Sequence, residues 1–509
     1  MLSMIFFERF IPLWLIFVLF VIIILSVSLY QEVLLLIKKQ KHIKKYLVFL
    51  LIIFLGGFLI RFVNINNSQC PLYDNFEQSA NGAIIASQGV YKYIDPPGHA
   101  VLATLITMLF GVTASASSIA NVVFGSLTIL VMFFVVAIHF QNAKTGLMAA
   151  FLVAFLKIPY LSSINGNTAV GTSVFFMLLS ILVFQVYLIT EKKNYLILLG
   201  LVVGFACQIY RLEISLLLIF FITWFLKNKN LWITIKKSFL IAIIIMIVLL
   251  PFFMYENVFF LQNTKTSLFI RYMGRSMQRV GLPVRLHEKN QYDDMVINMH
   301  GSENPYVGEL GLLFLGKSNF LYSNFDSCHF NYWFEYSKEK NIFHKFEFVN
   351  ILISVFFIMG IFYYVHKTKK TFFVIVFCIN LFIILIHELT NDLFLAYPLI
   401  LGIIPLASLT INKFYQRKKM FIIIMLIIII HHTLFSAVIP SFETSFLNKN
   451  YSNDKFVTTI YFYCYETSLN SNWTIYGPLC KPFERLLNNK EDINFKKIIF
   501  SLEKEDFIN

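Results

Sequence analysis

The segment 70–99 holds residue types that could carry out acid–base chemistry. Asp74 and Glu77 lie three positions apart, so a helix over this segment would carry both carboxylates on one face. Pro96 and Pro97 come directly before an apolar run, and proline favours the first turn of a helix. A carboxylate at the mouth of a membrane cavity can accept a proton from a substrate hydroxyl as a general base. The alternative is a solvated pair of carboxylates that caps a helix.

Two further groups of polar residues stand beside apolar runs. Arg211 and Glu213 lie between two such runs, where charges are costly unless they are paired or face water. They either line a substrate cavity or form an ion pair that only stabilises a helical hairpin. His387 and Glu388 end a later apolar run, and they either contact a substrate hydroxyl or a phosphate, or cap the helix end.

A row of arginines lies in the long polar segment 256–345. Arg271, Arg275 and Arg279 are four positions apart, so a helix would present them along one face. Guanidinium groups bind phosphate through two hydrogen bonds and stay charged, which predicts a phosphate site. Anionic lipid headgroups are the alternative ligand for the same face. The acidic and histidine residues in 287–300 show no metal-ligand spacing, so no metal site is predicted.

The composition indicates that membrane helices position these residues. Of 509 residues, 58% are hydrophobic and 14% are charged, against about 45–50% and about 25% in soluble domains. A soluble or disordered protein is therefore excluded. The net charge of +14 would suit a nucleic-acid binder, but the Lys and Arg residues cluster between apolar runs, as they do in cytoplasmic loops. Six cysteines do not form a framework, although Cys464 and Cys480 could be bridged.

Apolar runs that could cross the membrane recur along the whole chain. A crossing needs about 20 mostly apolar residues, and about 12 runs meet or approach that length. They are 10–30, 46–63, 97–112, 117–139, 169–190, 195–209, 212–226, 238–255, 346–366, 371–388, 395–411 and 420–440. A further run, 146–160, contains Lys157 and Pro159. We predict that it is re-entrant or interfacial, because only then do the basic loops fall on one side.

The basic loops give the orientation of the chain. The clusters that mark the cytoplasmic side are 38–45, 192–193, 227–237, 367–370 and 413–419. Segments 64–96, 256–345 and 441–509 then lie on the outer side. The sequence therefore predicts an all-α polytopic membrane protein, with one membrane domain over 1–440 and a C-terminal outer segment over 441–509.

The order of motifs in the first outer loop resembles that of the GT-C glycosyltransferases. The closest branch is the one with the protein O-mannosyltransferases and the aminoarabinose transferase of lipid A. In that branch, the motifs after the first span are, in order, an acidic residue, a helix of small residues, Gly-x-Tyr and Pro-Pro. The matching residues are Asp74, Ala80, Ala83, Gly89, Tyr91, Pro96 and Pro97. A second resemblance lies in Arg211-Leu212-Glu213, where the family often has Arg-Pro-Glu.

The resemblance implies a GT-C-like fold and an inverting sugar transfer on the outer side of the membrane. The donor would be a polyprenyl-phosphate sugar, and the acceptor a lipid, a glycan or a protein. Asp74 would be the catalytic base, with Glu77 as the second candidate. Tyr91, Glu213 and Tyr397 would line the substrate cavity with His387 and Glu388, and Arg211 would join the arginine row at the donor phosphate. No cofactor and no nucleic acid are expected, and the site would face away from the cytosol of a bacterial plasma membrane.

The chain departs from the family pattern at several positions. Asn75 replaces the Glu that usually follows the catalytic Asp, and Leu212 replaces the proline of Arg-Pro-Glu. Residues 165–168 lack the usual second Asp, and no Arg precedes Tyr397. The resemblance covers about residues 46–226.

Two other classes stay open. A polysaccharide polymerase or ligase also has about a dozen spans and an Arg-containing outer loop, but its pattern does not begin with an acidic loop and Pro-Pro. A lipid-linked glycan transporter or flippase should carry mid-membrane charges in repeated halves. No internal repeat is visible, and few such charges are present apart from Arg211 and Glu213.

Overall fold

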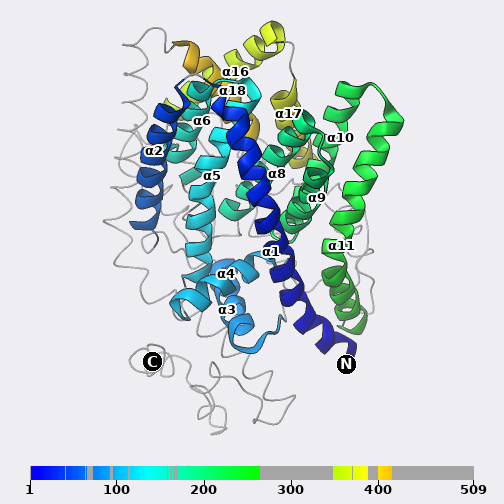
Figure 1. The fold of residues 1–509 in the computed structure, drawn as a ribbon. Helices are drawn as coiled ribbons and strands as arrows, with labels where there is room; N and C mark the ends of the chain where they lie inside the picture. Colours follow the sequence, from blue (N-terminus) through cyan, green and yellow to red (C-terminus); the bar gives the residue numbers. More distant parts are fainter. Residues whose placement is uncertain are drawn as a thin grey trace, which may run out of the picture.

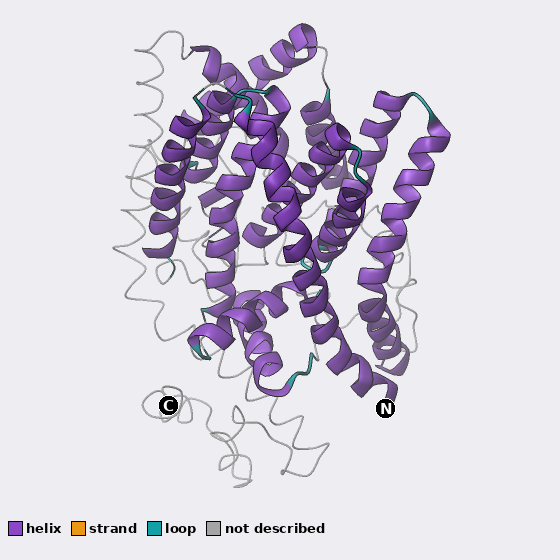
Figure 2. Cartoon of the chain, viewed as in Figure 1, coloured by secondary structure: helices purple, strands orange, loops and turns teal. Residues whose placement is uncertain are grey.

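A computed structural model gives the fold of the chain. It describes residues 2–40, 42–63, 65, 73–91, 96–112, 115–156, 159–160, 163, 170–263, 348–368, 371–387 and 399–414. This part is helical throughout and contains no strand (Figure 2). The prediction of an all-α protein is therefore confirmed.

The helices match the predicted apolar runs closely. The α-helices are α1 (Leu2–Lys38), α2 (Ile43–Val63), α3 (Tyr73–Gln88), α4 (Gly98–Phe110), α5 (Ala116–Phe140), α6 (Ala143–Phe155), α8 (Val170–Thr190), α9 (Lys193–Cys207), α10 (Ser215–Asn228), α11 (Leu231–Asn263), α16 (Phe348–Thr368), α17 (Phe372–His387) and α18 (Ile400–Phe414). A 3-10 turn, η2 (Arg211–Ile214), joins α9 to α10. The predicted run 420–440 and segment 441–509 lie outside the described residues.

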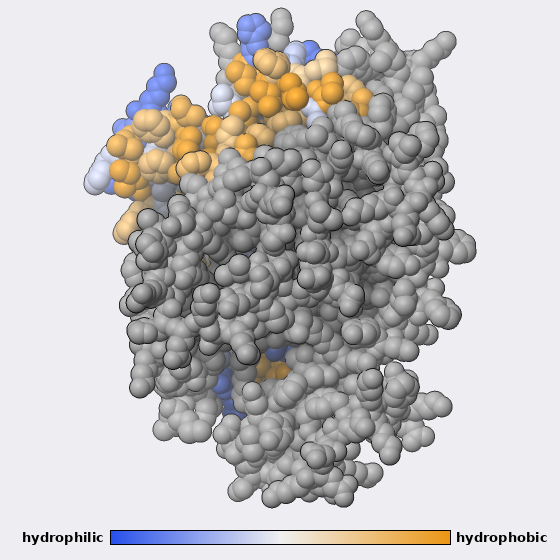
Figure 3. Space-filling model, turned by 180° about the vertical axis from the view of Figure 1, so that it is seen from behind, coloured by the Kyte–Doolittle hydropathy of each residue, from blue (hydrophilic) through white to orange (hydrophobic). Residues whose placement is uncertain are grey.

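Five helices are long and apolar enough to cross a membrane by themselves: α1, α2, α5, α8 and α11. Outward-facing side chains on α1, α2 and α11 are largely apolar, including Phe17, Leu55 and Phe239. Seen from behind, apolar residues cover most of the described part of the upper face, and hydrophilic ones project from its upper rim (Figure 3). The chain is therefore an integral membrane protein, because such a surface is stable only against lipid.

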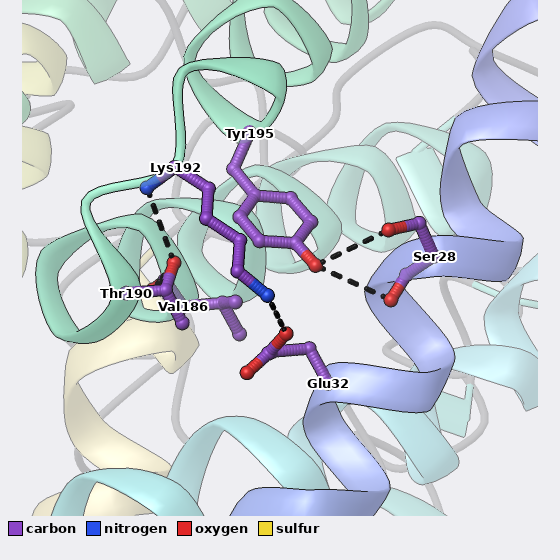
Figure 4. Close-up of polar contacts among 6 residues, drawn as sticks. All are labelled: Ser28, Glu32, Val186, Thr190, Lys192 and Tyr195. Atoms are coloured by element: carbon purple, nitrogen blue, oxygen red, sulfur yellow. Dashed lines mark hydrogen bonds and ion pairs between the residues drawn. The ribbon is translucent and has the colours of Figure 1, made fainter.

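The described parts of the basic loops lie toward one end of the bundle, as predicted for a cytoplasmic side. The side chain of Gln40 donates to the carbonyl of Ala137 at 3.0 Å, which brings the α1–α2 and α5–α6 turns together. Lys192, in the α8–α9 turn, pairs with Glu32 of α1, and beside it the Tyr195 hydroxyl contacts Ser28 (Figure 4). This end is called the inner end below, and the opposite end the outer end.

Two short helices, α4 and α6, lie differently from the prediction, in which the first crosses the membrane and the second is re-entrant. Each of α4 and α6 has 13 residues, or about 20 Å against a hydrocarbon thickness of about 30 Å. Helix α6 starts at the inner end and ends beside Arg61 in the last turn of α2, so it runs toward the outer end. Helix α4 lies across the lower end of α5 (Figure 1). The predictions that 146–160 is re-entrant and that 97–112 crosses were therefore wrong.

The exchange leaves the orientation of the other loops unchanged, because it replaces one crossing by another. Two short runs of similar composition could not be told apart by hydropathy. A second correction concerns α11, which continues to Asn263, beyond the predicted start of the outer loop at 256. Its 33 residues span about 50 Å, more than the hydrocarbon needs.

A small-residue contact holds α9 against α11. Gly200 and Gly204 are four positions apart on α9 and face Ile244 and Val248 of α11. A Cβ on Gly200 would lie 2.7 Å from Cβ of Ile244, and one on Gly204 would lie 2.9 Å from Cβ of Val248. The two backbones can approach this closely only because both positions are glycine, as in other membrane helix pairs.

A candidate active site at the outer end of the bundle

Helix α3 carries Asp74 and Glu77 in its first turns. The helix packs tightly on α4: a Cβ on Gly82 would lie 2.9 Å from the Cβ of Ala103. Ala80 and Ala83, the predicted small positions, are fully buried. The small residues therefore allow α3 to lie against α4, which fixes the helix that bears the two carboxylates. Glycine and alanine are used here because larger side chains would separate the two backbones.

The Pro96–Pro97 pair starts α4 and brings it to the turn between α9 and α10. Pro97 is the residue before the first turn, where a missing amide hydrogen leaves no orphan donor. The next amide, that of Gly98, donates to the carbonyl of Gln208 at 2.7 Å. Gln208 lies three residues before Arg211, so the contact places the start of α4 beside η2.

A buried hydrogen-bond chain ties α3, α4 and α5 together. The Ser117 amide donates to the Ser79 hydroxyl at 2.9 Å, and the Ser117 hydroxyl contacts His99 Nε2 at 2.7 Å. Burial lowers the pKa of His99 to about 4, since no water stabilises its charged form. His99 is therefore neutral at physiological pH. Because Ser79 is only five positions from Asp74, the chain anchors the helix that carries the carboxylates.

A second polar group lies one turn further along α5. Asn121 follows Ser117 by four positions, on the same face, and its Oδ1 accepts hydrogen bonds from the amide and hydroxyl of Thr172. The neighbouring Ser173 donates to Glu213 Oε1. Burial raises the pKa of Glu213, which lies in the turn between α9 and α10, well above its usual range. These contacts connect α5, the first turn of α8 and η2.

Glu213 forms no ion pair within the described part of the chain; its hydrogen bond is to Ser173. The side chain of Arg211 is not described, so the alternative of a structural Arg211–Glu213 ion pair stays a prediction. Tyr91 lies in the segment that connects α3 to α4 and is buried. Its amide donates to the carbonyl of Glu8 at 2.8 Å. The N-terminal part of α1 thus contacts the segment that connects α3 to α4 in the candidate site.

Arg61 holds the base of the first outer loop. Its guanidinium donates to the carbonyls of Gly57, Val153 and Ala154 at 2.8–3.0 Å and lies over the ring of Tyr160. The last two carbonyls belong to the C-terminal turn of α6, where a cation is favourable. The side chain thereby fixes the outer end of α2, which leads to α3.

The remaining predicted residues are only partly placed. Asp74 and Glu77 are on α3, Arg211 begins η2 and His387 ends α17, but their side chains are not described. Outside the described residues lie Glu388, Tyr397, Arg271, Arg275, Arg279, Cys464 and Cys480. Where the structure is described, no three His, Cys, Asp or Glu side chains gather as metal ligands.

Sequence reasoning missed four residues of this site: His99, Ser117, Asn121 and Arg61. A usable signal existed for three of them. Ser117 and Asn121 form an i, i+4 polar stripe inside an apolar run. Arg61, a charge in the last turn of an apolar run, was also a signal. His99 gave none, since a single histidine beside Pro-Pro does not reveal its partner on α5.

The comparisons with known proteins agree with this arrangement. Residues 95–255 match the family Dolichyl-phosphate-mannose-protein mannosyltransferase, a segment that runs from Pro-Pro to α11; Asp74 and Glu77 precede it. The structure of ArnT from Cupriavidus metallidurans bound to undecaprenyl phosphate is similar at a TM-score of 0.51, with 13% identity over 89% of this chain and 73% of that one. The chain therefore has the fold of this ArnT structure, which is GT-C-like.

The apo structure of the same ArnT gives a TM-score of 0.52, with 12% identity over 90% of this chain and 73% of that one. No curated protein matches the sequence. The GT-C fold confirms the resemblance that the outer-loop motifs indicated. The chain therefore shares its overall fold with ArnT.

Proposed function

We propose that the protein transfers a sugar from a polyprenyl-phosphate donor to an acceptor on the outer side of the membrane. The observation that carries this proposal is the position of α3. It bears Asp74 and Glu77, lies at the outer end of the bundle, and is tied to α4 and α5 by the Ser79–Ser117–His99 chain. The family match and the GT-C fold support the reaction class.

Asp74 is the proposed base. Its carboxylate accepts the proton of an acceptor hydroxyl, and the oxygen attacks the anomeric carbon of the donor sugar. The bond from that carbon to the phosphate oxygen breaks, and its electron pair leaves with the polyprenyl phosphate. A single displacement of this kind inverts the anomeric configuration. Glu77, one turn along α3, is the second candidate for the base.

The leaving phosphate requires cations nearby. Arg271, Arg275 and Arg279 are proposed for this role because of their spacing, and Arg211 because Gln208 brings its turn to the start of α4. Tyr91, Glu213, His387, Glu388 and Tyr397 are proposed to line the substrate cavity. No cofactor is needed, since the donor already carries its leaving group. The acceptor is a lipid, a glycan or a protein.

The test is sugar transfer by purified full-length protein. Radiolabelled polyprenyl-phosphate sugars are incubated with the protein and candidate acceptors, and the products are separated by thin-layer chromatography. We expect label to move from the donor lipid, and Asp74→Asn to lower turnover about 10²–10⁴-fold while membrane insertion stays normal. Near-normal turnover of Asp74→Asn together with loss in Glu77→Gln would assign the base to Glu77. Absence of transfer from every donor by the wild type would refute the proposed function.

A further inference from the structure

Asn121 has an unused hydrogen-bond donor deep in the protein. Its Oδ1 is identified by the Thr172 amide, which can only donate, at 3.2 Å, and the Thr172 hydroxyl adds a bond at 2.9 Å. The side-chain nitrogen Nδ2 must therefore point elsewhere. It has no hydrogen-bond partner among the described residues, and Asn121 is 0% exposed, so bulk water cannot bond to it. A buried donor without a partner is rare in native structures.

Glu213 has an unused oxygen in the same region. Ser173, the residue after Thr172, donates to its Oε1, while Oε2 has no partner among the described residues and Glu213 is 1% exposed. A buried carboxyl that has no ion pair among the described side chains is stable as the neutral acid, in agreement with its raised pKa. The proton then resides on Oε2, because Oε1 already accepts. Glu213 therefore also presents a donor.

The residues that carry the two donors both bond to the start of α8. Their bonding partners, Thr172 and Ser173, are adjacent residues in the first turn of α8, a helix of 21 residues. The N-terminal turn of a helix adds its own free amides and the positive end of the helix dipole. The two side-chain groups left without a described partner are therefore both donors, and a matching ligand must offer oxygen acceptors.

We propose that Asn121 Nδ2 and Glu213 Oε2 form a subsite that binds oxygen atoms of the donor sugar; this inference rests on the proposed function. Both groups are attached to the outer-end elements that hold the candidate site, because Asn121 follows Ser117 on one face of α5 and Glu213 belongs to η2. Uncharged donors suit sugar hydroxyl or ring oxygens, whereas a phosphate is held mainly by cations. Phosphate oxygens are also hydrogen-bond acceptors. The test therefore includes a lipid phosphate without a sugar as a separate probe.

The experiment measures binding by thermal stabilisation of the full-length protein, with two probes. One is undecaprenyl phosphate, which lacks a sugar, and the other is a polyprenyl-phosphate sugar that stabilises the wild type. Asn121→Asp keeps the acceptor for Thr172 but replaces the donor by an acceptor. Glu213→Gln keeps a donor next to an acceptor, and Glu213→Leu removes both. Asn380→Asp, at a buried Asn of α17 that bonds its own helix, is the matched control.

We expect Asn121→Asp and Glu213→Leu to weaken binding of the sugar-loaded lipid about tenfold or more, with undecaprenyl phosphate binding unchanged. Glu213→Gln and Asn380→Asp should stay within about twofold of the wild type. Retained binding of undecaprenyl phosphate also shows that each variant is folded. Should Asn121→Asp not fold, Glu213→Leu against Glu213→Gln decides alone.

Three results would overturn the subsite. Equal weakening of both probes would mean that the pair binds phosphate. Equal loss in Glu213→Gln and Glu213→Leu would mean that a carboxylate is needed instead of a donor. No change in any variant would mean that the buried groups hold only ordered water. Since binding is measured in place of turnover, a protein that binds the sugar-loaded lipid but transfers nothing would refute the proposed function and leave the subsite intact.

Discussion

The amide of Gly98 donates to the carbonyl of Gln208 at 2.7 Å, so the helix that follows Pro-Pro is joined directly to the end of α9. The two residues are 110 positions apart, and each lies beside a motif that resembles the GT-C pattern. Their contact brings the two motifs together at the outer end. It also explains the glycine, because a Cβ at position 98 would lie 2.7 Å from the Gln208 oxygen and 2.8 Å from its carbonyl carbon.

Gly98→Ala should therefore separate α4 from η2. The atoms that its methyl group meets are backbone atoms, which cannot move aside cheaply, so we expect a loss of stability of about 1–3 kcal/mol. A displacement of about 1 Å near a reaction centre lowers turnover on the order of 10²-fold. Sugar transfer and the apparent melting temperature report the two effects. Gly56→Ala is the control, since among the described residues its Cβ would meet only Phe155, at 3.9 Å. An equal loss in both variants would contradict the role given to the Gly98–Gln208 contact.

The corrected roles of α4 and α6 predict the sidedness of two loops. If α4 does not cross and α6 does, a reporter inserted after Gly111 should lie on the outer side. A reporter after Gln141 should lie on the cytoplasmic side, beside Gln40 and the basic loops. Fusions after Lys193 and Lys237 provide cytoplasmic references. The opposite sidedness at both sites would restore the re-entrant helix at 146–160.

Hydropathy predicted the helices well because membrane helices must satisfy their backbone internally and face lipid. The predicted runs 46–63 and 169–190 coincide almost residue for residue with α2 and α8. The same signal could not separate α4 from α6, because each is a short apolar helix. Their difference depends on the long-range contacts of Arg61 with α6 and of Gly98 with Gln208, which no local pattern encodes.

The candidate site was predictable where its residues form a contiguous motif. Asp74 and Glu77 on a small-residue helix, and Pro96–Pro97 before the next one, could be read from the sequence. Asn121 and Thr172 are 51 positions apart, and neither carries a charge that would draw attention. Their pairing arises only when α5 packs on α8. The donors Asn121 Nδ2 and Glu213 Oε2 could therefore be recognised only from the structure.

Arg61 should contribute strongly to stability, because three charge-assisted hydrogen bonds hold it inside the bundle. Each such bond is worth about 1.5–3 kcal/mol, and part of that is offset by desolvation of the guanidinium. We expect the apparent melting temperature to fall in the order Arg, Arg61→Lys, Arg61→Met, since lysine keeps the charge but cannot reach several carbonyls at once. Arg9→Met, at an exposed site of α1, is the matched control. If Arg61→Lys melted at the same temperature as Arg61→Met, a positive charge at this position would not by itself stabilise the protein.

The pH dependence of stability should carry a contribution from His99. Its pKa in the folded protein is about 4, against 6.5 for an ordinary histidine. Between these values the unfolded chain binds a proton that the folded protein excludes, so unfolding becomes more favourable as the pH falls. The contribution of neutral His99 is complete above pH 6.5 and is lost progressively toward pH 4. The total is roughly 3 kcal/mol, which is large for one side chain.

His99→Gln removes this titration while keeping an amide that can bond Ser117. The variant should therefore show a flatter decline of the apparent melting temperature between pH 6.5 and pH 4 than the wild type. Other groups titrate in the same window, so the difference between the two curves is the informative quantity. His42→Gln, at an exposed site of the inner end, controls for the loss of a histidine. Parallel curves for wild type and His99→Gln would mean that the ring can be protonated in the folded protein. The Ser79–Ser117–His99 chain would then tolerate a charge, and it could not hold α3 in the fixed position that the proposed base requires.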